Sequence, residues 1–151
     1  MVDPHQTFEV AGLLAIAGWL LVLVGLFARP LRRPSWAIAR FGVPTLLAIA
    51  YILLIIEGVR HAQGDLFGSL GAIRDLFAND SALAAGWLHY LAFDLFIGTW
   101  EAEDAERSGV PALLLVPCLA LTFLFGPVGL LLYFVLRLTF TGRSANREMP
   151  S

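Results

Sequence analysis

The sequence has no lysine, one cysteine and three histidines among its 151 residues, and each scarcity excludes a class of protein. All ten basic residues are arginines, and against 12 acidic residues they leave a net charge of −2. Nucleic-acid binding is excluded by this balance, because such proteins carry concentrated positive charge. The lone Cys118 cannot form an intramolecular disulfide, and we interpret it as a small core residue.

The histidines are too few and too scattered to build a metal centre. His5 lies in the N-terminal segment, His61 near the end of an apolar run, and His89 inside another. A bundle-type di-iron site needs Glu-x-x-His motifs, and a bis-histidine haem needs two facing histidines; neither is present in the sequence. Glycine-rich phosphate loops and the Gly-x-Ser-x-Gly elbow are missing too. We therefore predict no metal and no cofactor.

Apolar residues, in contrast, make up 58% of the chain, and the mean hydropathy is +0.77. A helix needs roughly 20 mainly apolar residues to cross about 30 Å of hydrocarbon. The runs that meet this requirement are about 8–27, 41–57, 82–100 and 111–137. They are unbroken rather than alternating, which favours helices over membrane strands. We predict one all-α domain over residues 1–151, an integral membrane four-helix bundle.

Small residues and helix-breaking residues predict how these helices pack and where they bend. Ala11, Gly18 and Gly25 recur every seven residues and predict a close helix contact. Pro117 and Gly126-Pro127 predict bends in the last span; a bend either shortens an overlong helix or frees the Phe123 carbonyl to line a pocket.

The segments between the spans are also patterned. Apolar residues at spacings of three and four over 66–77 predict a short interfacial helix between spans two and three. Asn79, Asp80 and Ser81 then offer N-caps for the third span. The acidic stretch 101–109 is interpreted mostly as a solvated connector.

Orientation follows from the arginines, which collect on the cytoplasmic side of membrane proteins. The first loop carries Arg29, Arg32, Arg33 and Arg40, but over four spans the arginines on the two sides tie. Because the first helix often dominates, we expect both termini outside. The first span is not interpreted as a cleaved signal peptide, since residues 1–9 hold acidic residues and no arginine.

The third span contains His89 and Asp94. A mid-span aspartate costs about 2.5 to 3.5 kcal/mol on insertion scales, so it needs a reason. At roughly 100° per residue the two side chains point about 140° apart. Asp94 shares its face with Tyr90 and Trp87, and His89 shares another with Phe93. Asp94 either locks the bundle through a hydrogen bond or serves a ligand, by binding or catalysis.

Glu57, Arg60 and His61, at the end of span two, are read instead as a terminal ion pair near the headgroups. The embedded polar pair among many aromatic side chains suits a long, apolar, lipid-dissolved ligand. Our predicted ligand-binding residues are Trp87, Tyr90, Phe93, Phe125, Gly126 and Pro127, and our predicted catalytic residues are His89 and Asp94.

The C-terminal half resembles a known family. The matching features are Trp87-x-His89, the triplet Asp94-Leu95-Phe96, and the turn Phe125-Gly126-Pro127-x-Gly129. Together they resemble the abscisic-acid-deficient-four-like family of the plant neoxanthin synthase factor and its bacterial relatives. The chain lacks the long N-terminal extension of plastid-targeted members, and we expect a bacterial relative in the inner (plasma) membrane.

The resemblance implies a cofactor-independent isomerase, or an essential component of one, of the kind that converts violaxanthin into the allenic neoxanthin. On this interpretation His89 is the candidate base and Asp94 the candidate acid, and these roles could be exchanged. The alternative is a non-catalytic module that binds an isoprenoid lipid or scaffolds other membrane enzymes. A transporter fits less well, because four short-looped helices leave little room for alternating access. Expected partners are a lipid or carotenoid, other membrane enzymes, or a second copy of the chain.

Overall fold

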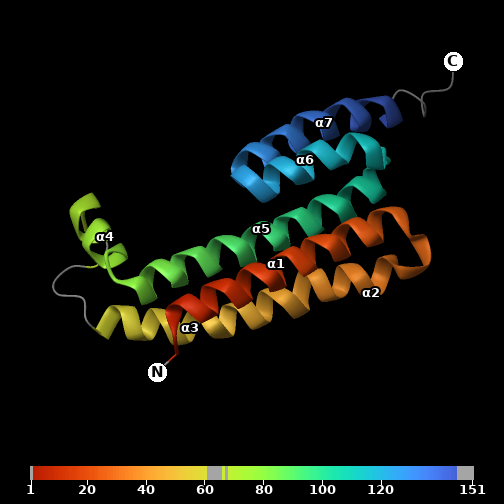
Figure 1. Cartoon of the computed structure of the whole chain (residues 1–151). Coiled ribbons are helices and arrows are strands. Elements are labelled where there is room, and N and C mark those ends of the chain that lie inside the picture. The colour runs from red at the N-terminus through yellow and green to blue at the C-terminus, as the bar shows by residue number, and fades with distance from the viewer. Residues whose placement is uncertain (1, 61–65, 67, 146–151) are drawn as a thin grey trace, which may run out of the picture.

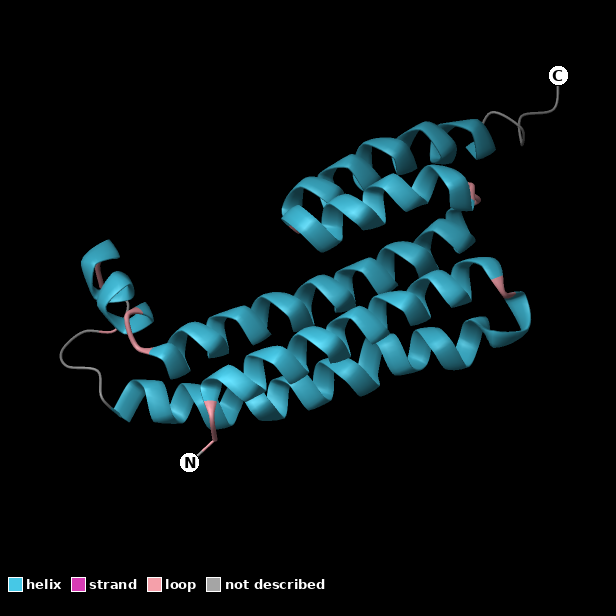
Figure 2. Ribbon diagram, in the orientation of Figure 1, coloured by secondary structure: helices cyan, strands magenta, loops and turns pink. Residues whose placement is uncertain are grey.

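A computed structural model describes residues 2–60, 66 and 68–145 of the chain, with side chains up to residue 140. Within these residues all regular structure is helical (Figures 1 and 2). The long helices are α1 (Pro4–Phe27), α3 (Val43–Arg60) and α5 (Asp80–Ser108), and the others are η1 (Arg29–Leu31), α2 (Arg32–Ala37), η2 (Ile38–Gly42), α4 (Leu70–Phe77), α6 (Ala112–Phe125) and α7 (Pro127–Ala145).

Three helical segments are long and apolar enough to cross a membrane: Pro4–Phe27, Arg29–Arg60 and Asp80–Ser108. They lie side by side along their length, with α5 packed against both α1 and α3 (Figure 1). The first three predicted spans fall within these segments. The prediction of a membrane protein built from helices is therefore confirmed.

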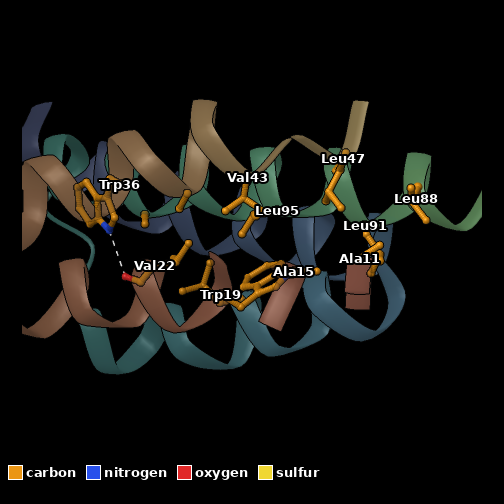
Figure 3. Close-up of a cluster of buried hydrophobic side chains, with 14 of the residues drawn as sticks. Ala11, Ala15, Trp19, Val22, Trp36, Val43, Leu47, Leu88, Leu91 and Leu95 are labelled. Carbon is orange, nitrogen blue, oxygen red and sulfur yellow. Dashed lines mark hydrogen bonds between the residues drawn. The ribbon is translucent and has the colours of Figure 1, made fainter. Parts of the chain in front are cut away.

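The helix contacts depend on small residues and on one indole. Ala11, Gly18 and Gly25 are all buried, as their seven-residue spacing predicted. Around them lies an apolar core between α1, α3 and α5, where Trp36 donates its indole N–H to the Val22 carbonyl at 3.1 Å (Figure 3). This bond ties the turn after α1 back onto α1 and positions the start of the second segment.

The fourth span is not one helix, and the prediction of a continuous span over 111–137 is wrong. The chain reverses at Gly126, which has φ of +44°, and α6 and α7 pack against each other as a hairpin beside the second half of α5 (Figure 1). Glycine adopts this backbone region readily, and Pro127 is suited to the first position of the returning helix. The sequence predicted a bend here, but Gly126 and Pro127 together reverse the direction of the chain.

Two further expectations need correction. The acidic stretch after residue 100 is helical up to Ser108, where Gly109, with φ of +72°, ends α5, so it is no solvated connector. A short helix exists between the second and third segments, but it begins only at Leu70, capped by Ser69, whose hydroxyl accepts from the Ala72 N–H at 3.1 Å. Leu66 lies outside it, and residue 67 is outside the described residues, as is His61.

The hairpin also changes the orientation argument. The start of α1 and the end of α7 lie at opposite ends of the structure, so the expectation that both termini lie on one side is wrong (Figure 1). Arg60 and Arg74 belong to the end where α1 begins. The opposite end carries Arg29, Arg32, Arg33, Arg40, Arg107, Arg137 and Arg143. Most of the described arginines therefore lie at one end of the structure, and the tie counted from the sequence does not hold for this arrangement.

Candidate functional site at the hairpin tip

Asp94, the middle residue of α5, lies against the tip of the α6–α7 hairpin. A Cβ atom added to Gly126 would stand 2.9 Å from Asp94 Oδ1, so the tip backbone approaches the carboxylate directly. Asp94 Oδ2 is buried and has no hydrogen-bond partner among the described residues. An unpaired carboxylate oxygen at mid-span is costly, and such groups are characteristic of functional sites.

Tyr90 joins Asp94 to the hairpin. It lies one turn earlier on α5, close enough to interact with Asp94, and its hydroxyl donates to the Phe123 carbonyl at 3.1 Å. Pro127 has no N–H to offer this carbonyl, as the prediction of a freed Phe123 carbonyl anticipated. The Tyr90 hydroxyl thus satisfies this carbonyl and links α5 to the hairpin.

Aromatic side chains continue from this point along α1 and α5. The Tyr90 ring lies 5.3 Å from that of Trp87, which lies 5.8 Å from that of Phe8. Trp87 and Phe8 border an open, mainly apolar cavity of about 380 Å³, which ends at His5 and Asp80. An open apolar cavity therefore lies beside the start of α1, and a row of partly exposed aromatic rings runs from it to Tyr90, one turn before Asp94.

His89 lies elsewhere. It stacks on Phe93 with ring centroids 4.5 Å apart, and it lies 5.9 Å from the ring of Tyr51 on α3. This is the α3 side of α5, whereas Asp94 lies on the hairpin side. Of the predicted site residues, the structure brings together Trp87, Tyr90, Asp94 and Gly126, while Phe125 and Pro127 are exposed at the tip and His89 and Phe93 are on another face.

The sequence analysis missed a buried acid close to Asp94. Glu101 is fully buried, two turns beyond Asp94, and both of its carboxyl oxygens lie within 3.1 Å of the Thr122 hydroxyl on α6. One hydroxyl donates only one proton, so this carboxyl is sparsely hydrogen-bonded. The i, i+7 spacing from Asp94 was the available signal, because it places both acids on one face of a helix.

Asp104 forms a third link to the hairpin. Its Oδ2 accepts the Tyr133 hydroxyl at 2.6 Å and the Arg137 Nε–H at 2.5 Å, both from α7. Tyr133 is fully buried, and this network lies near the arginine-rich end of α5. One face of α5 thus carries three acids toward the hairpin. Asp104 accepts from two side chains of α7, whereas Oδ2 of Asp94 has no hydrogen-bond partner among the described residues.

The described residues contain no group of three or more metal-ligating side chains. The site offers instead a carboxyl, a phenol and a turn backbone beside a row of aromatic side chains. This set can bind a long apolar molecule and move a proton at a polar atom of it.

The model of a family described as ABA DEFICIENT 4-like matches residues 6–133. The chain belongs to the ABA4-like family. Comparison with the curated proteins and with the solved structures gave no match. The family match runs from α1 into the first turns of α7, so in this ABA4-like protein it includes Asp94, Glu101 and the hairpin tip.

Proposed function

We propose that this ABA4-like protein is a membrane isomerase, or an essential component of one, that acts on a carotenoid-like lipid of the epoxycarotenoid type. The observation that carries the proposal is Asp94, whose Oδ2 has no hydrogen-bond partner in the described part of the chain and which lies one turn beyond a row of aromatic side chains, Phe8, Trp87 and Tyr90. A polyene along Phe8 and Trp87 would bring its oxygenated end group to the hairpin tip. Family membership supports a carotenoid-related substrate.

The reaction type fits one carboxyl group. Conversion of an epoxide into an allenic alcohol removes one proton from carbon, breaks one C–O bond of the epoxide and adds one proton to its oxygen, with no net oxidation. Asp94 can supply a proton through one oxygen and accept one through the other. In this scheme Tyr90 and the Gly126 backbone orient the carboxyl group.

His89 remains a separate candidate for the base. For His89 to act on the same substrate atom as Asp94, the ligand would have to reach both faces of α5. His89 contacts Phe93 and Tyr51 on the α3 side, whereas Asp94 lies on the hairpin side. The scheme based on Asp94 alone therefore predicts that His89→Ala keeps activity, whereas the two-residue scheme predicts that it loses activity.

The second candidate function is a non-catalytic module that binds an isoprenoid lipid or scaffolds other membrane enzymes. The open, mainly apolar cavity beside Trp87 supports it, since binding such a lipid needs no proton transfer. We place either activity in a bacterial plasma membrane with the start of α1 outside, on the strength of the arginine distribution.

The experiment that tests the proposal is pigment analysis, by liquid chromatography and mass spectrometry, of cells that make violaxanthin and this protein. Wild type is compared with Asp94→Asn, His89→Ala and Asp75→Asn, the last an exposed α4 carboxylate as matched control. A new allenic isomer that is lost only in Asp94→Asn supports catalysis at the hairpin tip. No new isomer, with wild-type protein present in the membrane, would overturn it; an isomer that persists in Asp94→Asn favours the scaffold.

A further inference from the structure

Two cavities meet at the corner where the chain turns from α1 to α3. The larger, about 1220 Å³, lies between the turn at residues 26–37 and the last turns of α5. The smaller, about 420 Å³, is a groove between α3 and α5. Phe41 lines both, so the two cavities are neighbours that share one side chain. Neither includes Asp94, and the site argued below does not depend on the proposed function.

The larger cavity is positively charged. Its lining includes two glutamates, of which Glu106 bonds to Arg32 and Glu103 bonds to Arg40. Three more arginines line it without an acidic partner among the described residues: Arg29, Arg33 and Arg107. Guanidinium groups bind phosphate oxygens through paired N–H donors, so this cluster suits a phosphate group.

The cavity also lies at the right depth for a lipid headgroup. The apolar helix α1 ends at Phe27, and Arg29 follows it directly. Hydrocarbon gives way to headgroups where apolar runs end and arginines begin. The phosphate of a phospholipid would lie at the level of these three arginines.

The groove has the opposite character. Its wall is mainly apolar and includes Pro44, Ala48, Ala92 and Phe93. Arg40 also lines it, and its guanidinium lies over the rings of Phe41 at 5.4 Å and Phe96 at 5.0 Å.

Arg40 has one unused donor. Its Nε is buried and has no hydrogen-bond partner in the part of the chain that the structure describes. The residue belongs to the π-helical turn η2, Ile38–Gly42. Such turns insert an extra residue into a helix and are frequent at functional sites. Here the turn holds Arg40 and Phe41 between the two cavities.

We infer that this corner binds an anionic phospholipid. Its phosphate lies among Arg29, Arg33 and Arg107, the Arg40 Nε–H donates to an ester carbonyl, and one acyl chain runs along the groove toward Phe93. The polar and apolar cavities account for the two halves of one amphiphile. If these arginines only oriented the chain in the membrane, the protein would bind anionic and neutral phospholipids equally well. It would also need no apolar groove beside them.

The test is a titration of the full chain in a neutral detergent, followed by native mass spectrometry. The probes are palmitoyl-oleoyl phosphatidylglycerol, phosphatidylcholine with the same chains, and soluble glycerol 3-phosphate. The variants are Arg33→Gln with Arg107→Gln, which weakens the headgroup site, and Ala48→Trp, which fills the groove. Arg74→Gln, at the other end of the molecule, is the matched control, and thermal unfolding is recorded for each.

We expect phosphatidylglycerol to bind best, with affinity reduced about fivefold per lost arginine and so roughly 25-fold in the double variant. Ala48→Trp should weaken both lipids, and Arg74→Gln neither. Equal binding of the two lipids, or full binding by the double variant, would overturn the inference. So would glycerol 3-phosphate binding as tightly as the lipid, since that indicates a soluble anion site. Where the double variant does not fold, Ala48→Trp decides: a folded variant that keeps full phosphatidylglycerol binding refutes the site.

Discussion

The backbone of Gly126 lies so close to the Asp94 carboxyl that a methyl group on Gly126 would force one of the two to shift. A Cβ on Gly126 would stand 2.9 Å from Asp94 Oδ1 and 3.3 Å from Oδ2. The contact joins a turn between two short helices to the midpoint of a membrane span. Two features therefore favour glycine at position 126: the positive φ of the turn and the closeness of the Asp94 carboxyl.

Gly126→Ala should therefore reduce both stability and product formation. The sparsely populated positive-φ backbone alone costs a residue with a Cβ about 1–3 kcal/mol, and the new methyl group would in addition press on the Asp94 carboxyl. The matched control is Gly109→Ala, because Gly109 also has positive φ but nothing within 4 Å of its Cβ position. Thermal unfolding in detergent should show the larger loss for Gly126→Ala. Equal losses would mean that the contact with Asp94 is unimportant.

Glu101 and Thr122 should behave as a coupled pair. Thr122→Val removes the hydroxyl that serves both Glu101 oxygens and should cost about 1–3 kcal/mol, because a buried carboxyl then lacks its donor. Adding Glu101→Leu to Thr122→Val should recover part of that loss, since apolar side chains then replace both partners. A double-mutant cycle on the free energy of unfolding measures the coupling. Additive effects would contradict a direct interaction.

The link between α5 and α7 should depend on the Tyr133 hydroxyl. Tyr133→Phe removes its 2.6 Å hydrogen bond to Asp104 and should destabilise the protein by about 1.5–3 kcal/mol, the usual range for a bond to a charged group. Tyr51→Phe is the control, because the contact described for Tyr51 is between its ring and that of His89. Limited proteolysis should release α7 earlier in Tyr133→Phe than in Tyr51→Phe. The same cleavage rate in both variants would show that the Tyr133–Asp104 hydrogen bond contributes little to holding α7 on α5.

The packing of α3 on α5 should be sensitive to a single methyl group. A Cβ on Gly58 would stand 2.8 Å from the Ala82 backbone nitrogen, and a backbone atom cannot move aside as a side chain can. Gly58→Ala should lower the unfolding temperature. Gly12→Ala, where nothing lies within 4 Å, should raise stability by up to about 1 kcal/mol through helix propensity. Effects of the same sign at both positions would contradict the close approach.

The arginine-rich end should face the cytoplasm. In a Cys118→Ala background, Gln6→Cys should react with a membrane-impermeant thiol reagent on intact cells, and Pro34→Cys only after the cells are permeabilised. Both positions are exposed, so the difference reports the side of the membrane. The reverse pattern would invert the topology and would show that the arginines of the first turn do not dominate insertion.

The local features were predictable wherever they depend on neighbours in sequence. The third long helix begins as its N-cap residues suggested, with the Asn79 side chain accepting from Ser81 N–H at 3.0 Å. The predicted angle between His89 and Asp94 also agrees with their different surroundings. The reversal at Gly126 was not predictable in the same way, because a bend and a turn share the same breaking residues, and only docking against α5 distinguishes them.

The sequence by itself determined the helical class of this protein, the first three of its four predicted apolar spans and its family, because each follows from composition, periodicity or motifs along the chain. Only the tertiary structure decided which polar groups meet. The hairpin returns Gly126 to Asp94 and Thr122 to Glu101, leaves His89 on another face, and moves the end of α7 to the arginine-rich side. The reason is physical: an apolar side chain is satisfied by lipid or by any packed neighbour, whereas a polar group needs a specific partner, whose position depends on how the helices dock.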